Sequence, residues 1–562
     1  MTFFIAIVTL VLFDVITPKV ALEGFANEQL ATIVLLLILG QILNKSEAVD
    51  TIFRKFLRKS DTPNQFKIKM LSSVGISSAV FNNTPLVAML MPFVYSWAKA
   101  KNQPVSRYLL PLSYASILGG SITLIGTSTN LIVSALAEEY GQPPLEMFDF
   151  TTVGVTMFVI GIAYLFFFGN KILRKRVLAS KGHIISSRKF FFETAIEPDS
   201  KLINKTVQVG KLRQLDGLFL VEIVRNKKAI RPVTPNEILQ VGDHLFFAGQ
   251  AKDIVNLDTE GLGLSYPNAV DFLKKEKMEL IELVVSHNSK FSGILIKDSN
   301  FRANFNATIL AIHRNGERVW GQLGNIELRA GDVLLVMPGT DFHKRITTSN
   351  SFYSISTTKS KKAIDNNKAL LLFLGMFGAI ILTATGILPL FKSLLVLLLF
   401  SIFSKITSYK DIKSAIDFNL VIIIALGLAL GKAIIASGTD RLITAGITPI
   451  YNQIGVIGLM AIIFLFTNGL ASLITSKAAV SVAVPIVITM ATNFGFDPKA
   501  FILLVAFAGA ANFITPIGYQ TNLMVYGPGG YSFKDFFKVG FPLTIMYLLV
   551  AVTILTMTFG FY

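Results

Sequence analysis

The chain has 562 residues, of which 52% are hydrophobic and only 15% are charged. This balance excludes an ordinary soluble globular protein of that length and indicates an integral membrane protein. There is no cysteine, which excludes disulfides, thiolate metal sites and thiol redox catalysis. The net charge is +17, but the basic residues flank apolar runs as the positive-inside rule expects, so nucleic acid is not an expected partner.

The first apolar runs, residues 2–17 and 28–43, each predict a membrane span. Asp14 and the lack of a cleavage motif favour an uncleaved span over a signal peptide. A basic link follows, within which 50–59 is amphipathic, and its charge places this loop and the N-terminus in the cytoplasm. Further apolar runs at 70–97, 108–136 and 152–172 complete a first transmembrane transport half over residues 1–178.

Between about 180 and 358 the chain becomes polar and contains all five histidines. Within it, "NEILQVGDHLFFAGQAKDI" at 236–254 resembles "NIELRAGDVLLVMPGTDFH" at 325–343, which predicts two copies of one small α+β unit. These residues resemble the TrkA C-terminal (RCK-C) module, with domains expected at 186–268 and 272–357. Basic clusters on both sides of the insert place it in the cytoplasm. The resemblance implies that it either binds a small regulatory ligand or stabilises a homodimer.

The chain then returns to apolar runs near 367–385, 387–405, 417–437, 452–487, 499–527 and 536–560. They predict a second transmembrane transport half over residues 365–562. The expected fold class is therefore an all-α polytopic protein of the cell membrane, surrounded by lipid bilayer and interrupted by α+β tandem domains.

Two polar stretches interrupt the apolar runs and are duplicated between the halves. "SITLIGTSTNLIV" at 121–133 matches "FITPIGYQTNLMV" at 513–525 at eight of thirteen positions. "NNTPLVAMLMP" at 82–92 shares its pattern with "TSKAAVSVAVP" at 475–485. Small residues also permit close helix packing, which is the alternative reading of any single stretch. Four stretches in two matched pairs favour a transporter whose binding site lies where the breaks meet.

A broken helix inside a membrane has a physical use. Unpaired backbone groups in hydrocarbon cost several kcal/mol each, so non-helical backbone persists only where it lines a cavity or binds something. A helix that starts after the break directs its free N–H groups at that cavity and suits an anion. Carbonyl groups of the unwound turns suit a hard cation such as sodium.

The motifs "FNNTPLVAMLMP", "PLSYASILGGSITLIGTSTNLIV" and "ITPIGYQTNLMVYGPGGY" resemble the divalent-anion:sodium symporter family of the ion-transporter superfamily, in the branch with two TrkA C-terminal domains that includes sulfate transporters. The resemblance implies an elevator-type homodimer with inverted repeats, re-entrant hairpins and broken helices. It implies a site for a small dianion, with sulfate favoured over a C4-dicarboxylate, and sodium as the coupling ion; no other cofactor and no transition metal are expected.

By that resemblance two sets of residues are assigned. The substrate-binding set is Asn83, Thr84, Thr127, Ser128, Ser476, Lys477, Tyr519 and Gln520. The cation-binding set is Asn83, Gly126, Thr127, Asn130, Ser476, Gly518 and Asn522.

Lys477 departs from the family pattern, which has Ser-Asn-Thr or Thr-Asn-Asn where this chain has Thr475, Ser476 and Lys477. An ionisable residue in a span is functional by default. Lys477 could stand where the second sodium would bind, reach the substrate, titrate and couple transport to protons, or extend to the membrane interface. Tyr519 at the break could narrow the site toward a compact oxyanion or simply pack.

Other function classes fit the residues less well. The alternatives to a sodium-coupled transporter are a proton-coupled or uncoupled anion transporter that uses Lys477, and an RCK-type gated cation channel or antiporter. The sequence contains neither a TVGYG-like filter nor paired intramembrane aspartates, which weighs against the channel or antiporter. Apolar runs without histidine, cysteine or carboxylate clusters weigh against an enzyme.

Overall fold

The protein was analysed as a computed structural model. It describes residues 2–44, 53, 56–57, 60, 62–173, 190–212, 215, 218–226, 228–230, 233–249, 264–265, 281–286, 289–314, 317–319, 323–339, 341–347, 349, 351–354, 366–416 and 418–561. Most of the predicted basic link, including most of its amphipathic segment, lies outside these residues, as do the edges of the predicted insert domains.

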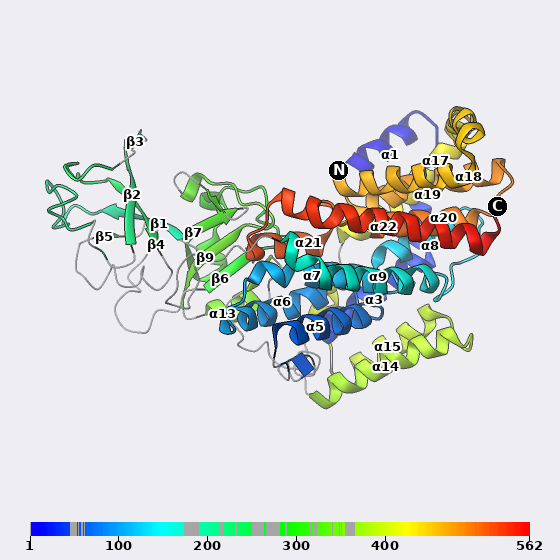
Figure 1. The fold of residues 1–562 in the computed structure, drawn as a ribbon, viewed down its shortest axis with the longest axis horizontal. Coiled ribbons are helices and arrows are strands. Elements are labelled where there is room, and N and C mark those ends of the chain that lie inside the picture. The colour runs from blue at the N-terminus through cyan, green and yellow to red at the C-terminus, as the bar shows by residue number, and fades with distance from the viewer. Residues whose placement is uncertain are drawn as a thin grey trace.

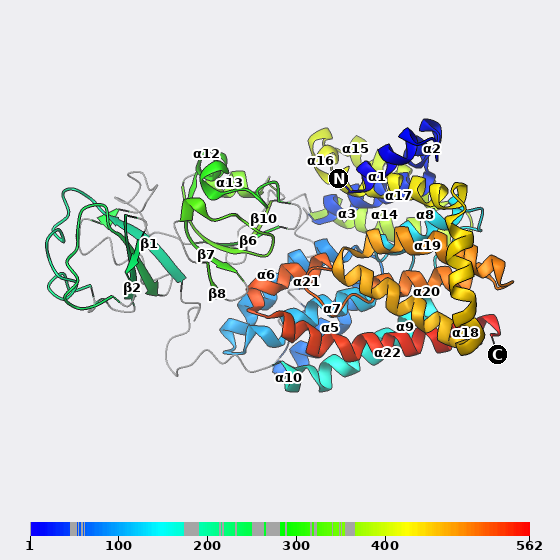
Figure 2. The same ribbon diagram turned by 90° about the horizontal axis from the view of Figure 1, so that it is seen from above.

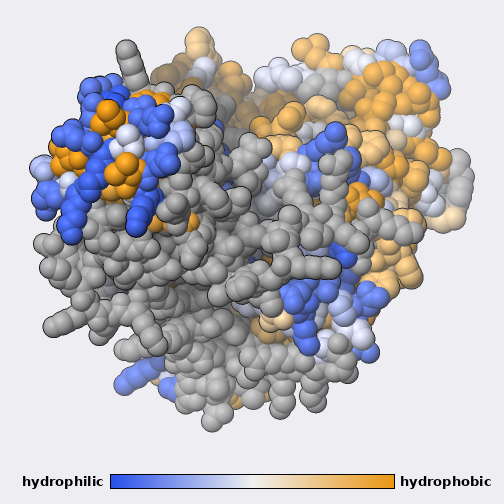
Figure 3. Space-filling view, turned by 60° about the vertical axis from the view of Figure 1, so that its left-hand side comes forward, coloured by the Kyte–Doolittle hydropathy of each residue, from blue (hydrophilic) through white to orange (hydrophobic). Residues whose placement is uncertain are grey.

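The described chain forms a helical body and an elongated insert of two small sheets (Figure 1, Figure 2). Both termini belong to the body, and the second sheet lies between the first sheet and the body. Hydrophobic residues dominate much of the body's surface, whereas hydrophilic residues are frequent on the first insert unit (Figure 3). This contrast is what a bilayer around the body and water around the insert would require.

The body consists of helices contributed by both halves of the chain. Before the insert these are α1 (Thr2–Leu12), α2 (Pro18–Glu23), α3 (Glu28–Asn44), α5 (Pro63–Ser78), α6 (Asn83–Ala100), α7 (Leu109–Gly120), α8 (Ser128–Glu139), α9 (Thr151–Phe167) and α10 (Gly169–Ile172). After it come α14 (Asn366–Ala384), α15 (Leu390–Phe403), α16 (Tyr409–Ala415), α17 (Phe418–Ala436), α18 (Thr439–Leu473), α19 (Ser476–Asn493), α20 (Pro498–Ala510), α21 (Gln520–Gly529) and α22 (Phe533–Phe559).

Many of the apolar runs form helices that are too short to cross a membrane on their own. Within the described residues, three helices are long and apolar enough to cross a membrane, or four if the pair at 18–26 and 28–40, bent by 42°, counts as one. The predicted span at 2–17 ends already at Leu12, since Asp14 just beyond it has a φ of 55° that no helix continues. A new helix begins at Pro18, capped by Thr17. The run at 452–487 contains the end of α18 and the start of α19, separated at Ile474 and Thr475.

The four polar stretches lie where helices stop and restart. Helices α5 and α6 are joined by residues 79–82, and α18 and α19 by residues 474–475. Helices α7 and α8 are interrupted at 121–127, and α20 and α21 at 511–519. The breaks that the sequence predicts are thus present, and each restart creates a helix N-terminus inside the apolar body.

The insert contains two five-stranded sheets of the same topology. The first has β1 (Phe190–Ile196), β2 (Leu218–Arg225), β3 (Lys228–Ile230), β4 (His244–Gly249) and β5 (Leu264–Ser265) in the order β3-β2-β4-β1-β5. The second has β6 (Ile281–Val285), β7 (Ala307–Arg314), β8 (Glu317–Arg318), β9 (Val333–Pro338) and β10 (Phe352–Ser354) in the order β10-β6-β9-β7-β8, with helices α12 (Phe301–Phe305) and α13 (Phe342–Thr347). Within the described residues, the paired strands of both sheets all run antiparallel.

The duplicated Gly-Asp turn is held by the same ion pair in both units. Arg225 Nε donates to Asp243 Oδ1 at 2.7 Å, and Arg314 Nε donates to Asp332 Oδ1 at 2.8 Å. Both aspartates are fully buried, so a guanidinium that satisfies both carboxylate oxygens offsets the desolvation of the charge. The sequence repeat is therefore also a repeat in structure.

The second insert unit packs directly against the body. Val284 and Val333 are buried in the same hydrophobic cluster as the body's helices. The turn at Gly331 lies against α21, since a Cβ on Gly527 would come within 2.5 Å of the Gly331 carbonyl oxygen. The Tyr95 hydroxyl on α6 lies 3.5 Å from Glu282 on β6. The unit thus contacts the far ends of two helices whose first residues lie at the polar breaks.

We expect the stability of the first insert unit to depend on pH through His244. Its Nδ1 lies 2.6 Å from Glu193 Oε1, and this hydrogen bond, together with the charges of Glu193 and Asp243, raises the His244 pKa against an opposing effect of burial. A raised folded-state pKa stabilises the protein below the ordinary value of about 6.5, and this contribution is lost as pH rises through the folded pKa.

The measurement is thermal unfolding of the full chain at pH 6 and pH 8, followed through the insert. His244→Gln and Glu193→Gln should each lose the extra stability at pH 6. An unchanged pH dependence in both variants would contradict this assignment.

Candidate functional site

Threonine hydroxyls tie each broken helix to the hairpin of its own half. In the first half the Thr123 hydroxyl donates to the Ala79 carbonyl and accepts from the Gly126 amide at 3.2 Å. In the second half the Thr515 hydroxyl donates to the Ser472 carbonyl at 2.9 Å and accepts from the Gly518 amide at 3.3 Å. Each hydroxyl satisfies one donor and one acceptor that the breaks would otherwise leave unpaired.

Buried asparagines complete the same pattern. Asn130 Nδ2 donates to the Thr123 carbonyl at 2.9 Å, and Asn522 Nδ2 donates to the Thr515 carbonyl at 3.2 Å. Both side chains have no exposed surface. The identities that the two stretches share in sequence are therefore the residues that hold each break in shape.

Tyr519 connects the two halves. Its hydroxyl lies 2.6 Å from the Asn83 amide at the start of α6 and 3.0 Å from the Thr127 hydroxyl at the start of α8. When the Asn83 amide oxygen faces this hydroxyl, the amide nitrogen donates to the Ser116 carbonyl at 3.0 Å. Tyr519 thus contributes hydrogen bonds as well as packing, so packing alone does not describe its role.

Thr84 and Gln520 close the same cluster from opposite halves. The Thr84 hydroxyl donates to Gln520 Oε1 at 2.9 Å, which joins the first turn of α6 to the first residue of α21. With Asn83, Thr127 and Tyr519, five of the assigned residues meet at the N-termini of α6, α8 and α21. The contacts among these five are all neutral.

The start of α21 differs from the other three restarts. Asn82, Thr127 and Thr475 each cap their helix by accepting a backbone N–H. Tyr519 makes no side-chain cap, and its hydroxyl is directed to the first half. Among the described residues no side chain caps the first amides of α21, and they are donors that an anion could use.

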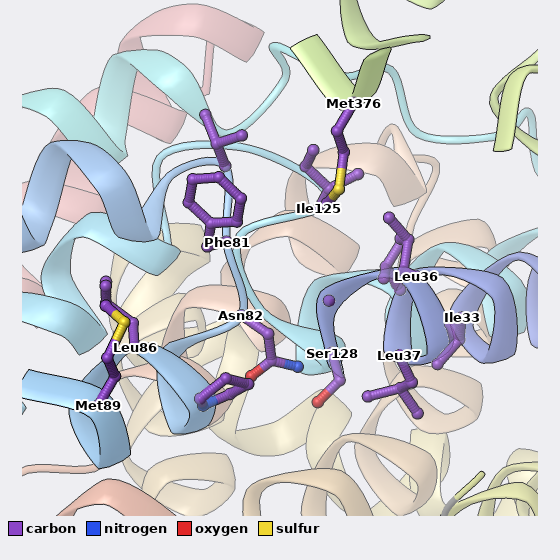
Figure 4. Close-up of a pocket in the computed structure, with 14 residues that line it drawn as sticks. Ile33, Leu36, Leu37, Phe81, Asn82, Leu86, Met89, Ile125, Ser128 and Met376 are labelled. Atoms are coloured by element: carbon purple, nitrogen blue, oxygen red, sulfur yellow. The ribbon is translucent and has the colours of Figure 1, made fainter. Parts of the chain in front are cut away.

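Ser128 begins α8 beside a pocket between the first hairpin and helices α3 and α14 (Figure 4). Its polar lining comes from Asn82 and Ser128, while Phe81, Ile125 and Met376 are among the apolar lining residues. Ser128 thus faces a largely apolar space next to the cluster, and the figure shows Asn82 and Ser128 directed toward the same region.

Ser476 and Lys477 lie at the start of α19, which packs against α8. Ser476 is 4% exposed and its hydroxyl has no hydrogen-bond partner among the described residues. Lys477 is partly buried, and its carbonyl accepts from Ser481 at 3.0 Å. The hydrogen bonds that join the five-residue cluster do not include these two side chains.

Two further residues belong to the neighbourhood but are absent from the assigned sets. The Ser113 hydroxyl on α7 lies 2.7 Å from Asn522 Oδ1 and 2.8 Å from the Thr521 hydroxyl. The Asn512 carbonyl accepts from Asn522 Nδ2 at 2.9 Å, and the Asn512 side chain is fully buried. The only sequence signal for either is a polar residue inside an apolar run.

We expect Tyr519→Phe to impair the site while leaving the ring in place. The change removes two hydrogen bonds and leaves buried partners unpaired, a loss of about 1–3 kcal/mol. Because 1.4 kcal/mol corresponds to a factor of ten, substrate uptake should fall roughly tenfold. Tyr140→Phe is the matched control, since the Tyr140 hydroxyl has no hydrogen-bond partner among the described residues. Equal uptake by the two variants in reconstituted vesicles would show that only the ring matters.

Comparison with known proteins places the chain in a family. It is 32% identical to a Chlamydomonas reinhardtii protein named as a sulfur deprivation response regulator, over 99% of this chain and 97% of that protein. It is 29% identical to an uncharacterized transporter of Synechocystis, over 99% and 93%. It is 26% identical to sodium/sulfate cotransporter 1 of C. reinhardtii, over 60% of this chain and 40% of that protein.

A structure of the Alcanivorax borkumensis YdaH transporter aligns with 97% of this chain and 88% of its own at a TM-score of 0.44 and 11% identity, too remote to inform the fold. The profile of the CitMHS family, described as citrate transporter, matches residues 1–483 and 380–561. The chain therefore belongs to the citrate transporter family and is a multi-pass membrane protein of a transporter type.

Proposed function

We propose that this protein is an elevator-type secondary transporter that takes up sulfate together with sodium. The observation that carries the proposal is the convergence of three helix N-termini, of α6, α8 and α21, on a cluster of neutral hydrogen-bonding side chains. Sulfate has four acceptor oxygens and no donor, so it suits hydroxyls, amides and free backbone N–H groups. The sodium/sulfate cotransporters among the relatives support the same substrate and ion.

Within this cluster Thr84 and Gln520 would separate to admit the anion. Their side chains bond each other at 2.9 Å, so a dianion between them replaces one neutral hydrogen bond by charge-assisted ones. The first amides of α21, which no side chain caps, would bind the same anion from the opposite half. A site assembled from both halves allows one half to move against the other, as alternating access requires.

The residues assigned to the first sodium fit a hard cation. Asn130 Oδ1 is completely buried and accepts no hydrogen bond from the described residues. An acceptor without a donor, beside the unwound backbone at Gly126, is the kind of oxygen that coordinates sodium. Bound sodium would supply positive charge next to the dianion, while Asn130 Nδ2 holds the unwound turn in place.

The main alternative to this proposal is a transporter in which Lys477 replaces the second sodium. Its place at the start of α19 puts a second possible source of positive charge in the second half, where the family pattern has a neutral residue. If the lysine takes over from the second sodium, uptake depends less on sodium and more on pH.

The test is uptake of labelled sulfate into proteoliposomes with and without an inward sodium gradient, at two pH values, for wild type and Lys477→Ala. We expect uptake that requires sodium and is competed by sulfate analogues but not by succinate. Uptake that ignores sodium, follows pH and is lost in Lys477→Ala would establish the competitor. No sulfate uptake under any gradient would refute sulfate as the substrate and leave C4-dicarboxylates to be tried.

We also propose that the insert lies in the cytoplasm and regulates transport through α21. The second insert unit touches that helix at Gly331 and Gly527, and Gln520 of the substrate cluster starts the same ten-residue helix. A displacement of the unit by a ligand or by dimerisation would therefore act on the helix that carries the site. A homodimer formed through the insert would supply such a displacement.

Gly527→Ala should alter the uptake rate by several-fold. The new Cβ would lie 2.5 Å from the Gly331 carbonyl oxygen and 2.9 Å from Val333 Cγ2, so the insert must shift away from α21. Gly446→Ala on α18 is the matched control, because a Cβ there meets no atom within 4 Å. Uptake assays should find Gly446→Ala unchanged; wild-type rates in both variants would mean that this contact does not influence transport.

A further inference from the structure

The two halves can be aligned residue by residue around their breaks. The broken helices correspond at an offset of 392 residues and the hairpins at an offset of 393. The shared threonine bonds, from Thr123 to Ala79 and from Thr515 to Ser472, obey both offsets at once. Four pairs of positions therefore correspond near the cation sites: 78 with 471, 83 with 476, 120 with 512, and 126 with 518.

In the first half, the side-chain amide near the proposed cation site comes from the hairpin. The Asn83 side chain bonds the Ser78 hydroxyl and lies over Gly120, where a Cβ would come within 2.4 Å of the amide. Its amide nitrogen also lies 3.3 Å from the Gly126 carbonyl. Position 120 must be glycine because the amide fills the space that a side chain there would need.

In the second half an amide reaches the corresponding place from the broken helix. Asn512 Nδ2 donates to the Ala471 carbonyl at 2.7 Å, and a Cβ on Gly518 would come within 2.2 Å of the amide. The hairpin position that corresponds to Asn83 is Ser476, which is too short to occupy the same space. The first half thus has Asn83 on the hairpin and Gly120 on the broken helix. At the corresponding positions the second half has Ser476 on the hairpin and Asn512 on the broken helix.

We propose that Asn512 supplies the amide oxygen of the second cation site, in place of the missing hairpin asparagine. The inference rests on the proposed function, because it takes sodium to be the coupling ion. It assigns to the second site a ligand that lies outside the sequence motifs, on the helix rather than on the hairpin. Ser476 then contributes a hydroxyl and Asn512 the amide oxygen, whereas in the first half the Asn83 amide occupies the corresponding space.

The oxygen atoms concerned have capacity for a cation. The only hydrogen bond that Asn512 Oδ1 receives from the described residues comes from Ser472 at 3.4 Å, longer than an ordinary O–H···O bond. The Ser476 hydroxyl is buried and has no hydrogen-bond partner within the described part of the chain. The hairpin start lies against the broken helix here, since the Ser476 carbonyl lies 3.8 Å from a Cβ placed on Gly509, one turn before Asn512. Two underused buried oxygens, one from the hairpin and one from the broken helix, suit a hard cation.

The exchange can be reversed by mutation. The experiment measures the melting temperature of the purified full-length protein against sodium chloride, with choline chloride holding ionic strength constant, for wild type, Asn512→Gly, Ser476→Asn and the double variant. Sodium that binds the folded state raises the melting temperature, so the titration reports affinity without substrate. Loss of a coordinating or supporting group lowers metal affinity by about 10–100-fold.

We expect Asn512→Gly to lose at least roughly tenfold in the apparent sodium affinity of one of two phases. Ser476→Asn alone places two amides in one space and should be destabilised. The double variant recreates the first-half arrangement and should recover most of the sodium response. Asn468→Ala is the control: its amide donates to the Ala508 and Ala511 carbonyls at 2.9 and 2.8 Å, so its loss should lower the melting temperature but not the sodium dependence.

The outcomes separate the inference from the proposed function. A wild-type protein stabilised by sodium, with Asn512→Gly unchanged in its sodium response, overturns the role of Asn512 and leaves sodium coupling intact. A double variant whose sodium response is no larger than that of Asn512→Gly also overturns the role of Asn512. An asparagine at position 476 would then not replace the amide of Asn512. A wild-type protein that sodium does not stabilise overturns both the inference and the sodium coupling.

Discussion

The structure depends on how broken helices are satisfied away from water. A helix interrupted in an apolar body exposes amides and carbonyls that cost several kcal/mol each if they stay unpaired. Thr123 and Thr515 meet this demand by bonding a loop amide and a hairpin carbonyl with one hydroxyl. These bonds fix each hairpin to its broken helix, and the positions of all four helix N-termini follow from them.

The five-residue polar cluster is a consequence of the same constraint. Once the breaks are held, Tyr519 of one half can reach Asn83 and Thr127 of the other, and Thr84 can reach Gln520. All these groups are neutral, so a dianion bound there, as proposed, would take its positive potential from helix ends, from bound cations or from Lys477. The proposed mechanism therefore depends on which cation, a second sodium or the Lys477 ammonium, is present in the second half.

The insert is more closely integrated than an appended domain. Val284 and Val333 are buried among the body's hydrophobic residues, and Gly331 lies against Gly527. The first unit makes its own contact with the second through Glu193, whose carboxylate accepts from both His244 and the Leu323 amide, the latter at 3.3 Å. A continuous chain of packed elements therefore runs from the first unit to α21.

The sequence alone determined the features that local chemistry dictates. The duplicated stretches at 121–133 and 513–525 predicted interrupted helices, because two matched pairs of polar stretches favour breaks and non-helical backbone persists in hydrocarbon only where it lines a cavity or binds something. The Gly-Asp repeat in the insert likewise predicted two equivalent units, and the Arg225–Asp243 and Arg314–Asp332 pairs show why the turn is kept. Membership of an anion transporter family also followed from motifs of this kind.

Only the tertiary structure decided which residues meet across the 436 positions that separate Thr84 from Gln520. Tyr519 appeared in sequence as a bulky exception, and only its contacts show that its hydroxyl bridges the halves. The span predicted at 2–17 shortened to α1 because apolar composition does not register the positive φ at Asp14. Nothing in the sequence assigned Asn512 to the site. An amide can fill the same space from the hairpin or from the broken helix, and only the three-dimensional structure shows that the two positions are equivalent.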